Sequence, residues 1–97
     1  MPVIVAGRVY VDPRDRERFV EEHRGTIEAA RNAPGCLDMA ISPDPVDPAR
    51  VNIFEHFETA EALERWRAAA PVPENPVAIE KDQVLKHEIS ASGPPFG

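Results

Sequence analysis

The chain has almost no cysteine and no long apolar run. Cys36 is the single cysteine among 97 residues, so neither a disulfide framework nor a CxxC metal or redox motif is available. The longest apolar stretches, such as VIVA near the amino end, are far too short to cross a bilayer, and no charged-then-apolar leader opens the sequence. We therefore expect a cytoplasmic protein without a membrane partner.

Positive charge is also scarce. The 11 basic and 17 acidic residues give a net charge of −6, and the basic residues form no stripe, so nucleic acid is not expected as a partner. The length predicts a single domain, residues 1–97, with a core at about 3–91 and a tail at 92–97. A chain of this size buries only about 60 to 65% of its unfolded surface. Because self-association would bury more, we expect a homodimer.

Two kinds of spacing predict six elements. Apolar and polar residues alternate, as in β-strands, over 3–11, 36–42, 51–58 and 83–91. Helical spacing follows the cap residues Asp12, up to about Asn32, and Thr59, up to about Ala69. The buried stripe of the second helix is expected to consist of Ala62, Leu63, Trp66 and Ala69. The order βαββαβ predicts an α+β, ferredoxin-like fold with a four-stranded antiparallel sheet and the helices on one face.

Strand alternation assigns each side chain to a face of this sheet. The helix-facing side is expected to include Leu37, Met39 and Ile41 from the second strand and Leu85, His87 and Ile89 from the last. The other, open face is expected to carry Ile4, Ala6, Tyr10, Ala40 and Phe54 with Arg8, Asn52, His56 and Lys86. Face-to-face pairing of two such sheets would bury this apolar surface in a dimer.

The segments PGCLDM and NIFEHFETAEALERW, in this order within βαββαβ, resemble the antibiotic biosynthesis monooxygenase domain of the dimeric α+β barrel superfamily. The resemblance implies a ligand pocket between the sheet and the helices of each protomer. Many members oxidise quinols, anthrones or related polyketide aromatics without flavin or metal, so it implies a monooxygenase that needs no cofactor and acts on a small aromatic metabolite. The expected substrate-binding residues are Trp66, Ile53, Phe57 and Met39.

Of the functional positions of the relatives, only the tryptophan is retained here. Haem-degrading relatives use an Asn on the first strand, a Trp on the second helix and an iron-binding His ten residues beyond it, and the matching residues are Gly7, Trp66 and Pro76. Because proline cannot bind iron, haem degradation is not expected. Polyketide-oxygenating relatives often carry a second Asn where this chain has Ala62. An isomerase or cyclase on the same scaffold, or a non-catalytic ligand-binding or dimerisation module, is therefore an alternative.

A cofactor-free oxygenase needs a base that converts an acidic substrate into an electron-rich anion able to reduce dioxygen. Histidine suits this role because its ordinary pKa is about 6.5. The catalytic candidates are His87, on the predicted helix-facing side, and His23, on the sheet-facing stripe of the first helix. A lone histidine on an apolar face is more often a hydrogen-bonded core residue, and this interpretation stays open for both.

The remaining polar candidates are given structural interpretations. Glu55 is expected to support Thr59 and the helix start rather than to act as a pocket acid. Trp66 is either core or a flat wall for an aromatic ligand. Cys36 is expected to be a small buried hydrophobic residue. Because His56 and His87 are predicted on opposite faces of the sheet, no metal site is expected.

Overall fold

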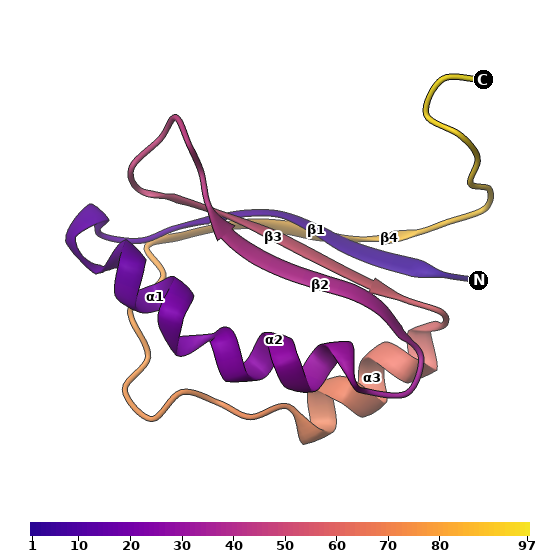
Figure 1. The fold of residues 1–97 in the computed structure, drawn as a ribbon, viewed down its shortest axis with the longest axis horizontal. Helices are drawn as coiled ribbons and strands as arrows, with labels where there is room; N and C mark the ends of the chain where they lie inside the picture. Colours follow the sequence, from indigo (N-terminus) through magenta and orange to yellow (C-terminus); the bar gives the residue numbers. More distant parts are fainter.

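The computed structural model describes all 97 residues as one antiparallel sheet with helices on one of its faces (Figure 1). Its strands lie in the order β2–β3–β1–β4. In chain order the elements are β1 (Val3–Tyr10), the 3₁₀ turn η1 (Pro13–Asp15), α1 (Arg16–Glu22), α2 (Arg24–Arg31), β2 (Cys36–Pro43), β3 (Arg50–Phe57), α3 (Ala60–Ala69) and β4 (Lys81–Glu88). The predicted α+β ferredoxin-like fold is confirmed. None of the helices is long and apolar enough to span a membrane.

Both predicted helix caps are formed. The Asp12 carboxylate accepts a hydrogen bond from the Arg14 backbone N–H at 2.9 Å, and Thr59 Oγ1 accepts one from the Ala62 N–H at 3.0 Å. The first predicted helix is nevertheless divided at His23, where φ is −95° and ψ is 0°. In a regular helix the His23 backbone N–H would donate a hydrogen bond to the carbonyl oxygen of Phe19. Here Nδ1 of the His23 ring is hydrogen-bonded to that oxygen instead, at 2.7 Å. The backbone N–H bonds to Val20 O instead, at 3.2 Å.

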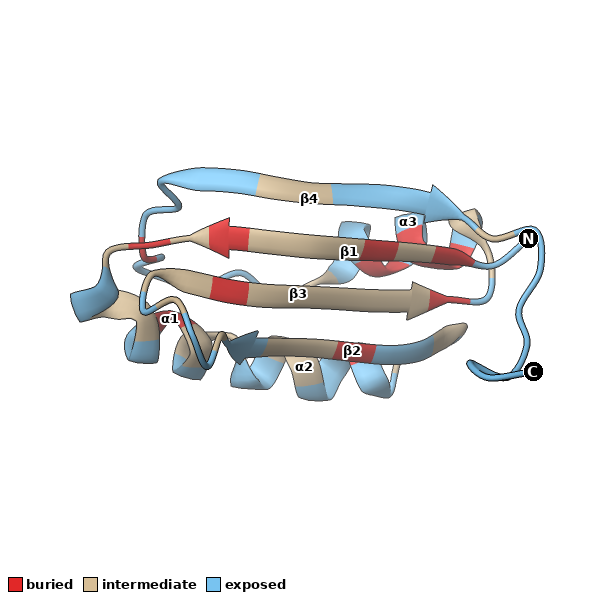
Figure 2. Ribbon diagram, turned by 90° about the horizontal axis from the view of Figure 1, so that it is seen from above, coloured by how far each residue is buried: buried red, intermediate tan, exposed pale blue.

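The core consists of two clusters at opposite ends of the sheet's helix-facing side. The first gathers under α3 and the end of α2, and the second gathers under α1; on β3 their buried residues, Phe57 and Val51, lie near the two ends of the strand (Figure 2). The first cluster contains Val3, Val5, Ala30, Met39, Phe57, Ala62, Leu63 and Trp66. The second contains Val9, Val11, Phe19, Val51 and Val77.

The register of β4 corrects its predicted faces. Leu85 pairs with Ala6, and His87 pairs with Ile4, so both lie on the open face, where 66% of Leu85 is exposed. Lys86 pairs with the buried Val5 and therefore lies on the helix-facing side. In the sequence pattern, one side of the last strand has two apolar residues, Leu85 and Ile89, and the other has only Val84, so the first side was predicted to face the helices. Val84, however, pairs with Gly7 and occupies the helix-facing side where Gly7 has no side chain.

Two smaller expectations are also wrong. Leu37 was expected beside Met39, but a β-bulge between Cys36 and Asp38 interrupts the alternation and leaves half of Leu37 exposed. Ala69, expected in the buried stripe of α3, is exposed because the helix ends there. The other open-face assignments on β1, β2 and β3 are confirmed, including His56, which pairs with Ile4. His56 and His87 therefore share this face instead of lying on opposite ones.

Candidate functional site

The middle of the helix-facing side is only half-buried, between the two core clusters. Gly7, Ile53 and Val84 form one row across β3, β1 and β4, and Glu55 lies two residues along β3 from Ile53. From the helices, His23 and Ile27 follow the buried Phe19 in steps of four residues and therefore lie on the same helical face. All six residues are half-buried, and we call them the inner patch: Gly7, His23, Ile27, Ile53, Glu55 and Val84.

Glu55 is the acidic group of the inner patch. It pairs with Val5 on one side and Met39 on the other, both buried, so apolar side chains flank the carboxylate on the sheet. Burial raises the pKa of Glu55, and the charge of Arg67 on α3 opposes the rise. The expected support of the helix start is absent, because Thr59 caps α3 alone. In the sequence, Glu55 alternates with Ile53 and Phe57, and this spacing already indicated that its side chain lies on the helix-facing side.

His23 is held in one tautomer. Its Nδ1 lies 2.7 Å from the Phe19 carbonyl oxygen, which can only accept a hydrogen bond, so Nδ1 carries the proton. In the neutral form of the ring, Nε2 is then the proton acceptor. The ring also packs on Phe19, with 4.5 Å between the ring centroids. His23 thus lies on the side predicted from sequence and combines a structural role with a free acceptor.

The predicted apolar residues fall into two groups. Met39, Phe57 and Trp66 come together in the first core cluster and are 3%, 0% and 8% exposed, so they belong mainly to the packed core. Ile53 is half-buried in the inner patch. The exposed edge of Trp66 borders a depression of about 230 Å³ that it shares with Ala33, Pro34, Arg65 and Ala69, none of which belongs to the inner patch.

His87 lies outside this site. It is exposed on the open face, beyond Ile4, so the premise that placed it beside the helices is wrong. The cause is the register of β4 described above. No three His, Cys, Asp or Glu side chains are grouped so that they could hold a metal ion. Cys36 is half-buried rather than fully buried, and burial raises the pKa of its thiol, which disfavours the thiolate.

The positions at which relatives carry asparagine have no room for it here. A Cβ atom on Gly7 would lie 2.1 Å from the Gln83 carbonyl oxygen, and Gly7 has a φ of +149°, which L-residues rarely adopt. Ala62 is 2% exposed, and its Cβ lies 2.5 Å from where a Cβ on Gly35 would be. Pro76, at the position of the iron-binding histidine, is exposed in the coil between α3 and β4.

Several solved structures share this fold. A Chloroflexus aurantiacus protein assigned to the antibiotic biosynthesis monooxygenases is 21% identical with a TM-score of 0.73, and the match covers 100% of both chains. A haem-degrading protein of Mycobacterium tuberculosis is 20% identical with a TM-score of 0.69, over 97% of this chain and 100% of that one. A Pseudomonas aeruginosa protein is also 20% identical with a TM-score of 0.73, over 93% and 95%. At these identities the likeness establishes the fold alone.

Sequence comparison identifies the family. An uncharacterized protein of Synechocystis is 30% identical over 63 residues, which make up 65% of this chain but only 43% of that protein. The matched region thus spans less than half of the relative's length. The model of the family described as antibiotic biosynthesis monooxygenase matches residues 2–72, most of the sequence. The chain belongs to the antibiotic biosynthesis monooxygenase family.

Proposed function

We propose that this protein is a cofactor-independent oxygenase that binds a small conjugated aromatic metabolite, such as a phenol, quinol or anthrone, over the inner patch. The observation that carries the proposal is a pair of half-buried proton acceptors, His23 and Glu55, on an otherwise apolar surface. A base in such a partly dry site can convert the ligand into the anion that gives an electron to dioxygen.

The apolar residues around these acceptors suit a flat ligand. In the proposed site the half-buried Ile53 forms the apolar floor, while Met39 and Phe57 are neighbours of Glu55 along β2 and β3. Trp66 on α3 belongs to the same core cluster as Met39 and Phe57. A bound anthrone is therefore expected to perturb Trp66 without stacking on its buried ring.

Oxygen consumption tests this function directly. Purified protein with anthrone as the probe should consume oxygen above the rate of the buffer alone, without added flavin, metal or haem. Equal rates with and without protein would contradict an oxygenase. Haem is not proposed as the ligand, because the exposed Pro76 offers no ligand atom to iron.

A second candidate is a cofactor-free isomerase or cyclase acting over the same patch. The closed positions at Gly7 and Ala62 favour it, since they exclude the asparagines found in polyketide-oxygenating relatives. Such an enzyme would use the same base and no oxygen. Conversion of a ligand under strict anaerobiosis, at the rate seen in air, would select this candidate over the first.

The open face supports a homodimer as part of the proposal. Its central row consists of Ala40, Phe54, Ala6 and Leu85, all apolar, and polar residues lie at both ends of the face. No element covers this row within the chain (Figure 2). Pairing of two such faces around a two-fold axis would bury the exposed Leu85 of both protomers. A non-catalytic dimer module would share this interface and would lack any turnover.

A further inference from the structure

Glu55 is a half-buried carboxylate without a donor. No backbone or side-chain group donates a hydrogen bond to it, and it joins no ion pair within 4.0 Å, so desolvation and the charge of Arg67 are the influences on its ionisation. No fully buried side-chain oxygen of the structure lacks a partner, so the Glu55 carboxylate still reaches water, but its partial desolvation costs free energy. Nothing in the fold uses the carboxylate, because Thr59 alone caps the following helix. Such a group is typical of a site that meets a ligand.

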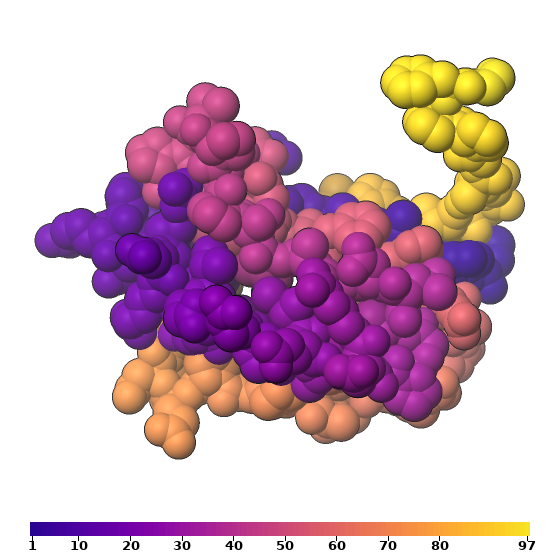
Figure 3. Space-filling model, viewed as in Figure 1, coloured from indigo at the N-terminus to yellow at the C-terminus, as the bar shows by residue number.

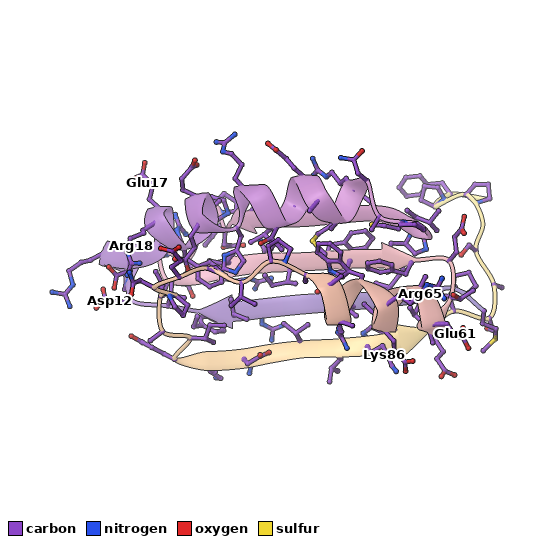
Figure 4. All side chains as sticks on the ribbon, turned by 90° about the horizontal axis from the view of Figure 1, so that it is seen from below. Asp12, Glu17, Arg18, Glu61, Arg65 and Lys86 are labelled. Atoms are coloured by element: carbon purple, nitrogen blue, oxygen red, sulfur yellow. The ribbon has the colours of Figure 1, made fainter.

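The groups around Glu55 include positive charge that is not already paired. Arg67 on α3 is exposed, and its guanidinium takes part in none of the ion pairs of the structure. Arg67 follows the buried Leu63 of α3 by four residues, so it lies at the edge of the helix face that packs on the sheet. From there its positive charge favours the ionised form of Glu55. Lys86 projects from β4 on the same side of the sheet, beside α3 (Figure 4). A carboxylate with unpaired basic side chains on the same side of the sheet suits a ligand that gives a proton to the carboxylate and is left with a negative charge.

We propose that Glu55 is the catalytic proton acceptor of this site and that Arg67 holds the anion formed on the ligand, an inference that rests on the proposed function. With an anthrone, the Glu55 carboxylate takes the acidic ring C–H proton and becomes a neutral carboxyl group. The electron pair of the broken C–H bond moves into the ring system, and the carbonyl oxygen becomes an enolate oxygen beside Arg67. This step needs neither oxygen nor any other oxidant.

His23 is the weaker candidate for this proton. Its ring is already hydrogen-bonded to the Phe19 carbonyl oxygen and packs on the Phe19 ring, and His23 is the residue at which α1 and α2 are divided. No cation is paired with it, so an anion formed near His23 would be stabilised only by the imidazolium itself. Glu55 has no structural partner to lose when it meets the ligand.

Solvent exchange of the ligand proton tests the assignment without relying on oxygenation. Anthrone is incubated with the protein in D₂O under anaerobic conditions, and loss of its acidic C–H signal is followed by NMR. The wild type should accelerate exchange over buffer, and Glu55→Gln should lower that acceleration about 100-fold or more while anthrone still quenches Trp66. Glu55→Asp should retain part of the rate. Arg67→Gln should slow exchange and leave Glu55-dependent exchange detectable.

Matched variants separate a specific effect from a general one. Glu58→Gln and Arg65→Gln change exposed residues on the same β3–α3 segment and should exchange at the wild-type rate. Wild-type exchange in Glu55→Gln, or its loss in His23→Gln alone, would overturn the inference while leaving the proposed function intact. Exchange that depends on Glu55 without any oxygen consumption would support the inference and contradict the oxygenase. Absence of anthrone binding to the wild type would overturn both.

Discussion

Gly7 and Glu55 lie on neighbouring strands, at positions that face the helices. Gly7 has no side chain there, and Glu55 carries a carboxylate. Gly7 allows the β4 backbone to approach β1 closely, which favours stability. Glu55 places a charge among apolar neighbours, which opposes it. The two residues are thus expected to respond to substitution in opposite directions.

Gly7→Ala should be strongly destabilising. The new Cβ would lie 2.1 Å from Gln83 O and 2.9 Å from Val84 Cα, both backbone atoms that cannot move alone, and φ would stay at +149°. Strain and overpacking together cost roughly 2 to 5 kcal/mol in the free energy of unfolding. Gly25→Ala is the control, because nothing lies within 4 Å of its Cβ and alanine favours a helix by about 0.5 to 1 kcal/mol. Equal melting temperatures, or equal urea midpoints, for the two variants would contradict the close approach of the β4 backbone to Gly7.

Glu55→Gln should stabilise the protein near pH 7. Burial raises the pKa of Glu55, so the folded protein binds this proton more tightly than the unfolded chain does. Ionised Glu55 therefore lowers stability above the folded pKa, and the penalty disappears below the unfolded value of about 4.3. Thermal melts should show a gain for Glu55→Gln at pH 7 and almost none at pH 3.5, with Glu58→Gln unchanged at both. A loss of stability at pH 7 would indicate that the carboxylate has a partner.

At the scale of elements, the sequence predicts type and order better than it predicts register. The caps at Asp12 and Thr59 and the alternation over β1 and β3 are local features, and the structure follows them. The faces of β4 and the exposure of Leu37 depend instead on contacts between strands, namely the space over Gly7 and the bulge in β2. His87 was misplaced for this reason, whereas the side of His23 depended only on helical spacing. The grouping of Met39, Phe57 and Trp66 came from the family resemblance.

The connection between β2 and β3 is expected to open in acid. Hydrogen bonds from the backbone N–H of Asp47, the Asn52 side chain and the Val46 N–H lower the pKa of Asp44 to about 2. A lowered folded pKa stabilises above the unfolded value of about 3.9, and this contribution is lost as pH falls through about 2. The protection factors of the Val46 and Asp47 amides, which compare their exchange rates with those of an unstructured peptide at the same pH, should therefore stay high at pH 4 and fall near pH 2.

Removing the carboxylate should have the same effect at any pH. Asp44→Ala should accelerate exchange of these two amides at pH 6, while Glu74→Ala, an exposed change in another coil, should leave them unaltered. Protection that persists in Asp44→Ala would assign the order of this connection to Arg16 instead, whose guanidinium donates to the carbonyls of Asp44 and Asp47 at 2.9 and 2.8 Å.

At the scale of the whole molecule, one layer of helices covers one face of one sheet (Figure 1). The carboxyl-terminal segment projects away from this body (Figure 3), and Phe96 is 96% exposed. The opposite face retains an apolar centre that water contacts in a single chain. A molecule of this shape is expected to pair with a second copy.

Light scattering at micromolar concentration should give twice the 10.7 kDa mass of the chain. Leu85→Lys places a charge at the centre of the open face and should shift the mass toward a monomer. Its circular dichroism should stay unchanged, because Leu85 is already 66% exposed within the chain. Val72→Lys, at a residue that is 80% exposed in the coil, is the control. A monomeric wild type would contradict the dimer.

The most direct test of the central claim is a titration of the single tryptophan, Trp66, with anthrone. Binding over the inner patch predicts saturable quenching, and Ile53→Asn should weaken the affinity at least about tenfold by removing the apolar floor. Ile79→Asn, a change in the coil that is 48% exposed, should bind as the wild type does. Quenching that rises linearly without saturation, or equal affinity in the Ile53 and Ile79 variants, would contradict a ligand site on this patch.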